Sequence, residues 1–164
     1  MAAEEIMIND SVRVLAAKAY VGDIQKYREP IKKCTDSIEF LKQKTYSIGS
    51  MKITDTKIQA PQGQQGAAYE NNLIKLDKLR DSFNRNYFHW KCKILNPLIS
   101  IGKINNLDYQ YLLWFRYSSC KSWEDIQKGL ECEDIYTIRD QALLALSYVM
   151  ESEGKLQKYA CGLL

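Results

Sequence analysis

The sequence predicts an all-α protein from three observations. Apolar residues recur at alternating three- and four-residue steps over two long stretches, which places them along one face of a helix. Only 3 prolines and 8 glycines occur in 164 residues, too few for a turn-rich all-β fold. A shorter stretch near the C-terminus shows helical apolar patterns separated by brief polar breaks. We therefore expect a long antiparallel helical hairpin followed by a C-terminal domain of three short helices.

The first long helix is expected to begin after Asp23, a good N-cap residue. Residues 1–22 before it are mildly amphipathic and predict one short helix ending near Gly22, or a partly ordered leader. Pro30 predicts a bend rather than an end, because the apolar seam keeps its register through it. The seam consists of Ile24, Tyr27, Ile31, Cys34, Ile38 and Leu41.

Residues 46–68 break this period and contain several Gly and Gln residues, which predicts a long loop with a short alternating piece at 51–53. A second long helix is expected from Tyr69, and Pro97 should end or bend it. Its seam is formed by Tyr69, Leu73, Leu76, Phe83, Tyr87, Trp90 and Ile94, with Arg80 as the exception. The two helices, within residues 23–103, are expected to bury their seams against each other or against a second copy of the chain.

The C-terminal pattern begins after Asn105 and Asn106, either of which is a candidate N-cap. Ser122 is the candidate N-cap of the next helix, with acidic residues in its first turn. A last helix is expected from Asp134 to Glu153, with Gly154 as its stop. The first of the three helices should bury Leu107, Tyr111, Trp114 and Phe115 on one face. This arrangement over residues 104–153 predicts a helix-turn-helix domain, followed by a tail at 154–164.

The segment YLLWFRYSSCKSWEDIQ resembles phage late transcription regulators of the ArpU/RinA type. The matching residues are Leu113, Arg116, Tyr117, Lys121, Ser122, Trp123, Glu124, Asp125 and Ile126. The resemblance covers roughly residues 23–148. It implies a helix-turn-helix similar to region 4 of bacterial sigma factors, preceded by a coiled-coil-like pair of helices. The chain departs from that family between Leu130 and Ile135, where Glu131-Cys132-Glu133-Asp134 replaces a longer link containing Gly.

The last helix carries the candidate residues for reading DNA. Gln141 suits adenine and Arg139 suits guanine, because both side chains form paired hydrogen bonds with base edges. Asp140 on the same face opposes the phosphate backbone. The candidate DNA-contacting residues are Lys121, Lys128, Tyr136, Thr137, Arg139 and Gln141. The residues expected to form the structural core of the helix-turn-helix are Tyr117, Trp123, Ile126, Leu130 and Ile138.

Charge is unevenly distributed along the sequence. Residues 1–103 hold 17 Lys/Arg and 11 Asp/Glu, a net charge of +6, whereas residues 104–164 hold 6 and 9, a net of −3. Phosphate neutralisation supplies much of DNA affinity, so an acidic C-terminal part disfavours simple DNA docking. Two alternatives to a DNA-binding regulator therefore stay open. One is a helical protein-protein interaction module with a degenerate helix-turn-helix, and the other is a structural virion protein.

Catalytic and metal-binding patterns are absent from the sequence. His89 is the single histidine, and the 5 cysteines form no CxxC pair, so we expect no enzyme activity, cofactor or metal. Reduced thiols and the lack of a signal peptide or membrane span favour the cytosol, and the resemblance implies that this is the cytosol of a bacterial host. The expected partners are promoter DNA, RNA polymerase and a second copy of the chain through the heptad helices.

Overall fold

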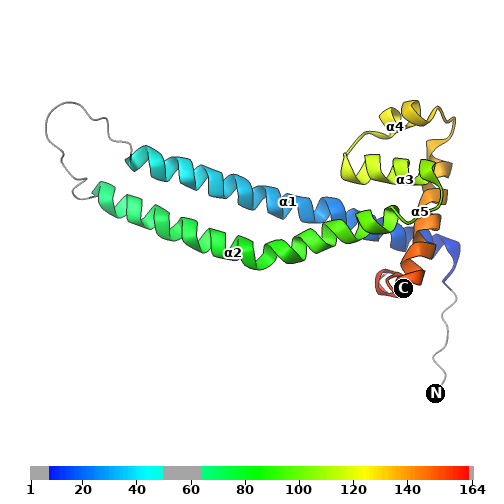
Figure 1. Cartoon of the computed structure of the whole chain (residues 1–164), viewed down its shortest axis with the longest axis horizontal. Helices are drawn as coiled ribbons and strands as arrows, with labels where there is room; N and C mark the ends of the chain where they lie inside the picture. Colours follow the sequence, from blue (N-terminus) through cyan, green and yellow to red (C-terminus); the bar gives the residue numbers. More distant parts are fainter. Residues whose placement is uncertain (1–7, 50–63, 163–164) are drawn as a thin grey trace, which may run out of the picture. The chain divides into compact units, whose positions relative to one another are not determined.

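The computed structural model describes residues 8–49 and 64–162, and all the regular secondary structure in these residues is helical (Figure 1). The prediction of an all-α protein is confirmed. The chain divides into two compact units. Unit 1 consists of residues 1–27 and 91–164, and unit 2 consists of residues 28–90.

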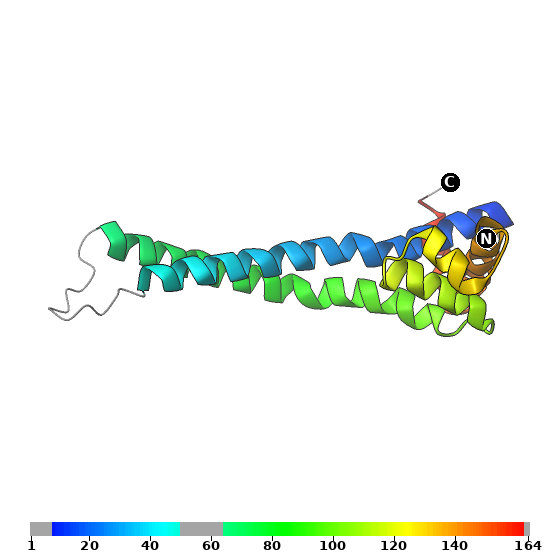
Figure 2. The same cartoon turned by 90° about the horizontal axis from the view of Figure 1, so that it is seen from above.

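Two long helices, α1 (Asp10–Gly49) and α2 (Gln64–Ile101), contribute residues to both units. Within unit 2 their segments run alongside each other in both views (Figures 1 and 2). Leu76 is buried there, and the Phe83 ring lies 5.0 Å from that of Tyr87 and 6.4 Å from that of Trp90. Most other predicted seam residues of unit 2 are only half-buried, including Ile31, Cys34, Ile38, Leu41 and Leu73. Unit 2 therefore buries a narrow apolar strip rather than a deep core.

Both long helices extend beyond their predicted limits. The break expected at Gly22 is absent, because α1 begins at Asp10 and passes through this residue. Burial of Val21 and Ile24 offsets the helix-weakening effect of glycine at this point. Pro97 does not end α2, which continues to Ile101.

The predicted loop at residues 46–68 is largely outside the described residues. Of this range, the structure places 46–49 in α1 and 64–68 in α2. The second helix therefore begins before Tyr69, at Gln64. The alternating piece at 51–53 lies outside the described residues.

Unit 1 contains the main hydrophobic core. Its further elements are α3 (Leu107–Leu113), a π-helical turn η1 (Trp114–Ser118), α4 (Trp123–Leu130), α5 (Ile135–Ser152) and α6 (Leu156–Ala160). The start of α1 packs into this core, so residues 10–22 are part of the domain rather than a separate leader. The buried residues include Ala16, Ala17, Val21, Ile24, Ile101, Leu112, Leu113, Ile126, Ala142, Leu143, Leu146 and Met150.

Individual residues cap or end the helices of unit 1. Asn106 caps α3 by accepting hydrogen bonds from the backbone N–H groups of residues 108 and 109, and Ser122 caps α4 by accepting from that of Asp125. Asp134 caps α5 in the same way. Gly154, with a φ of 67°, follows the end of α5. The predictions for Ser122 and Gly154 are confirmed, and Asn106 rather than Asn105 caps α3.

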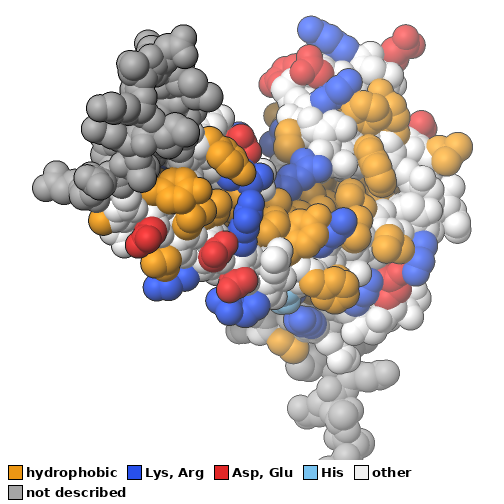
Figure 3. Space-filling view, turned by 60° about the vertical axis from the view of Figure 1, so that its left-hand side comes forward, with side chains coloured by type: hydrophobic (Ala, Val, Ile, Leu, Met, Phe, Trp, Pro, Cys, Tyr) orange, Lys and Arg blue, Asp and Glu red, His pale blue; other side chains and the backbone are white. Residues whose placement is uncertain are grey.

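The predicted buried face of the α3 region is wrong apart from Phe115, which is half-buried and packs against the core. Leu107 is 75% exposed and Trp114 is 43% exposed, whereas Leu112 and Leu113 are fully buried. Leu113 and Tyr117, four residues apart, lie on the buried face instead, and Tyr117 is part of the π-helical turn η1. Hydrophobic side chains are exposed beside Lys and Arg on the face seen in Figure 3.

The C-terminal tail folds back on unit 1. Leu156 and Ala160 of α6 are buried, and the Tyr159 ring packs edge-on against that of Tyr20 at 5.1 Å. The Tyr159 hydroxyl donates a 2.7 Å hydrogen bond to Asp23. Burial and then this hydrogen bond raise the pKa of Tyr159. The tail is therefore an integral part of the hydrophobic core.

Candidate nucleic-acid interface

The link between α4 and α5 is short but well supported. It contains four residues, Glu131 to Asp134, and begins with Glu131 in the left-handed conformation at φ 50° and ψ 36°. The side-chain amide of Gln127 donates to the carbonyl oxygens of Cys132 at 3.1 Å and Glu133 at 3.0 Å. Gln127 thus stabilises the turn between α4 and α5. Helical spacing alone does not predict that the Gln127 side chain faces this link.

The predicted core residues beneath this turn differ in depth. Ile126 is 1% exposed and Tyr117 is buried, and this burial raises the pKa of the Tyr117 hydroxyl. Leu130 and Ile138 are half-buried and pack against the core. Trp123 is half-buried as well, so its predicted role as a deep core residue is only partly met.

Trp123 instead forms cation–π contacts with two arginine side chains. The Arg116 guanidinium is 4.9 Å and that of Arg139 is 5.9 Å from the centre of its rings. Arg116 also donates a 2.9 Å hydrogen bond to the carbonyl of Lys121, which holds the loop before α4. These cation–π contacts connect η1, α4 and α5 at the surface.

The first two turns of α5 present polar side chains outward. Tyr136 is 55% exposed, and Thr137, Asp140 and Gln141 are exposed too. The Thr137 hydroxyl donates to the Asp134 carboxylate. This bond, with those from the backbone N–H groups of Thr137 and Tyr136, lowers the pKa of Asp134 despite an opposing effect of desolvation. The negative charge of Asp134 therefore stays at the N-terminus of α5, where the carboxylate accepts hydrogen bonds from the free backbone N–H groups and interacts favourably with the helix dipole.

The two strongest candidates for base recognition have partners within the protein. Arg139 Nε donates a 2.7 Å hydrogen bond to Asp140 Oδ1, and this bond raises the pKa of Arg139. The same guanidinium lies 5.3 Å from the centre of the Tyr136 ring. Gln141 accepts a 3.0 Å hydrogen bond from the Tyr109 hydroxyl. Arg139, Tyr136 and Trp123 thus form one cluster, which Gln141 borders on α5.

The candidate lysines lie on other elements. Lys121, in the loop before α4, has its ammonium 4.5 Å from the centre of the Phe115 ring. Lys128 is exposed in the last turn of α4. Exposed carboxylates of Glu124, Asp125, Glu131 and Glu133 are interspersed with these cations. The surface is therefore mixed in charge rather than a basic patch.

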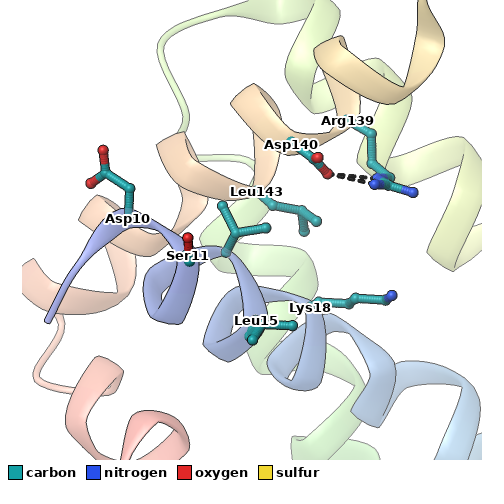
Figure 4. Close-up of a pocket in the computed structure, with 8 residues that line it drawn as sticks. Asp10, Ser11, Leu15, Lys18, Arg139, Asp140 and Leu143 are labelled. Atoms are coloured by element: carbon teal, nitrogen blue, oxygen red, sulfur yellow. Dashed lines mark hydrogen bonds and ion pairs between the residues drawn. The ribbon is translucent and has the colours of Figure 1, made fainter. Parts of the chain in front are cut away.

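A shallow hollow of about 450 Å³ lies between the start of α1 and α5 (Figure 4). Its lining includes Leu15 and Lys18 from α1, and Arg139, Asp140 and Leu143 from α5. Lys18 did not emerge as a site residue from the sequence, because only the tertiary packing of residues 10–22 brings it beside α5.

Other chemistry finds little support in the described residues. No cluster of three or more His, Cys, Asp or Glu side chains is arranged there as metal ligands would be. None of the five cysteines, all of which lie in the described residues, forms a disulfide. Among the described helices, none has both the length and the apolar character that a membrane span needs.

Comparison with protein-family models, with curated proteins and with solved structures finds no match. A functional assignment therefore depends on the residues and geometry of this surface.

Proposed function

We propose that this chain is a DNA-binding transcription regulator of the phage late-gene type. In this proposal α1 and α2 form an antiparallel hairpin, and α3 to α5 form a helix-turn-helix domain that acts at promoter DNA in the cytosol of a bacterial host. The observation that carries the proposal is the exposed N-terminal half of α5, joined to α4 by a turn of four residues. Such a helix fits the major groove and places its first turns against base edges.

The rigidity of this helix supports a reading role. Ile126, Leu130 and Ile138 pack in or against the core and hold α4 and α5 together, while Gln127 fixes the turn between them. Tyr136, Thr137 and Gln141 are exposed on the opposite side of α5. Side chains on a rigid element can discriminate between bases because they lose little freedom on binding.

Unit 2 offers the positive charge that the helix-turn-helix lacks. Residues 28–90 hold 11 Lys/Arg and 7 Asp/Glu, a net charge of +4. Residues 1–27 and 91–164 together hold 12 and 13, a net of −1. In the proposed regulator, the hairpin supplies sequence-independent attraction to phosphate and α5 supplies discrimination. RNA polymerase and a second copy of the chain are further proposed partners.

A second candidate function is a protein-protein interaction module with a degenerate helix-turn-helix. The observation that favours it is the exposed apolar surface of the α3 region, where Leu107, Tyr111 and Trp114 are 75%, 38% and 43% exposed. Aromatic residues of this kind are enriched at protein interfaces. The acidic surface around α4 also suits a protein partner better than DNA.

Fluorescence anisotropy with labelled fragments of the source genome tests the proposal, at about 50 and 200 mM salt. The double variant Arg139→Ala/Gln141→Ala should lose the preference for the bound fragment, with about 1–3 kcal/mol of discrimination lost per paired base contact. The control Arg85→Ala/Gln43→Ala removes the same side-chain types from exposed positions in unit 2. It should weaken binding to all fragments similarly and keep the preference.

Either of two results would contradict the assignment. An unchanged preference in Arg139→Ala/Gln141→Ala would place base recognition outside α5. Complete lack of binding at about 50 mM salt, where phosphate contacts are strongest, would favour the protein-interaction module. The search for a partner would then begin with RNA polymerase subunits.

A further inference from the structure

The hollow between α1 and α5 has an acidic residue at one end and two basic residues at the other, where Asp140 is paired with Arg139. Asp10 and Ser11 lie at one end, and the Lys18 and Arg139 side chains extend to the other (Figure 4). Leu15 and Leu143 line the space between them. Two cations from different helices therefore share one end of the hollow, although residues 104–164 are acidic as a whole.

Both cations can accept an external anion. Lys18 is exposed, and no carboxylate among the described residues forms an ion pair with it. Arg139 Nε and Nη2 both lie 2.7 Å from a single carboxylate oxygen, Asp140 Oδ1. The side chain of Asp140 is 51% exposed, and ion pairs exposed to this degree contribute little to stability. An anion with two oxygens can therefore take the place of Asp140.

We propose that Lys18 and Arg139 form a binding site for a backbone phosphate of the DNA duplex that α5 reads. This inference rests on the proposed DNA-binding function. A phosphodiester presents two unesterified oxygens, which match the planar fork of a guanidinium, while an ammonium group adds a point charge beside it. Arg139 exchanges Asp140 for the phosphate rather than for a guanine edge, so that base discrimination falls to Gln141, and Lys18 extends the DNA interface to α1.

The exchange gives Asp140 a defined role. In the free protein this carboxylate forms an ion pair with the Arg139 guanidinium and adds negative charge where a phosphate would approach. It therefore lowers affinity for every duplex, whatever the sequence. The guanidinium also lies 5.9 Å from the ring centre of Trp123 and 5.3 Å from that of Tyr136, so these contacts hold Arg139 in place when Asp140 is released.

The test compares three single variants of the full chain by fluorescence anisotropy with the preferred fragment and an unrelated duplex, between about 50 and 200 mM salt. Lys18→Gln should weaken binding to both duplexes and reduce the slope of log affinity against log salt by about one. Lys158→Gln, the matched control, makes the same charge change at an exposed position on α6 and should leave the slope unchanged. Asp140→Asn should bind both duplexes several-fold more tightly. Circular dichroism checks that each variant is folded.

The outcomes separate this inference from the proposed function. If Lys18→Gln behaves like Lys158→Gln while the wild type binds its fragment, the phosphate site is overturned and the regulator stands. If Asp140→Asn gains no affinity, the exchange at Arg139 is overturned. If the wild-type chain binds no duplex at about 50 mM salt, both the regulator and the phosphate site are overturned.

Discussion

The hydroxyl group of Ser100, fully buried near the end of α2, donates a 2.6 Å hydrogen bond to the carboxylate of Glu153, just after α5. Lys155 donates 2.7 Å to the same oxygen, and Lys103 donates to the other. The Tyr20 hydroxyl, 3.0 Å from Ser100 Oγ, connects this network to α1. One carboxylate thus joins α1, α2 and the segment before α6.

This network predicts an acid-sensitive contribution to stability. Burial alone would raise the pKa of Glu153, but hydrogen bonds from Lys103, Lys155 and Ser100 outweigh it and lower the pKa to about 2. In the unfolded chain the pKa is near the ordinary 4.5. The contribution, about 1–3 kcal/mol, is therefore complete above pH 4.5 and is lost as the pH falls toward 2.

Urea denaturation of the wild type and Glu153→Gln at several pH values measures this contribution. The two proteins should differ most in unfolding free energy at neutral pH, and the difference should shrink between pH 4.5 and 2. Other carboxylates with lowered pKa values affect both proteins equally and cancel from the difference. A difference that stays constant over this pH range would show that Glu153 is not the titrating group.

Trp123→Ala should destabilise the protein less than loss of a deeply buried tryptophan would. Removal of a buried Trp costs about 3–5 kcal/mol, but Trp123 is half-buried, so about 2–3 kcal/mol is expected. Trp123→Phe keeps a ring beside Arg116 and Arg139 and should lose about half as much. Thermal and urea unfolding followed by circular dichroism measure both variants. A larger loss for the Phe variant than for the Ala variant would rule out the stacked arrangement.

Glu131→Gly should stabilise the protein. Glu131 has a φ of 50°, a conformation that costs energy for a residue with a side chain but not for glycine. The expected gain in unfolding free energy is about 0.5–1 kcal/mol. The control Glu133→Gly removes the same charge from the same link, where φ is not positive, and should be neutral or destabilising. Equal effects of the two substitutions would show that charge, rather than backbone conformation, is responsible.

Leu156→Ala should show that the tail belongs to the fold of unit 1. Leu156 is 2% exposed, and truncation of a buried leucine costs about 2–5 kcal/mol. Leu107→Ala provides the matched control, because Leu107 is 75% exposed and its truncation should change stability by less than about 0.5 kcal/mol. Urea denaturation midpoints, with the m-value unchanged, give the loss of unfolding free energy for both variants. A small effect for Leu156→Ala would mean that α6 detaches without loss of the core.

Local sequence signals identified the helix ends of unit 1 well. Ser122, Gly154 and the Asn105–Asn106 pair were recognisable because capping and helix termination depend on the residue itself and its immediate neighbours. The same reasoning failed at Gly22, where burial of Val21 and Ile24 stabilises the helix through a residue that weakens it.

The all-helical class and the presence of two long helices follow from the sequence, because apolar periodicity and scarcity of Gly and Pro act locally along the chain. Tertiary structure decided which faces are buried. Trp114 is exposed and Tyr117 is buried, because packing selects the face that carries Leu113 and Tyr117 over the equally periodic face that carries Leu107 and Trp114. Tertiary packing also places Lys18 and Arg139 in the lining of one hollow, since residues distant in sequence come together only when the core that carries both is formed.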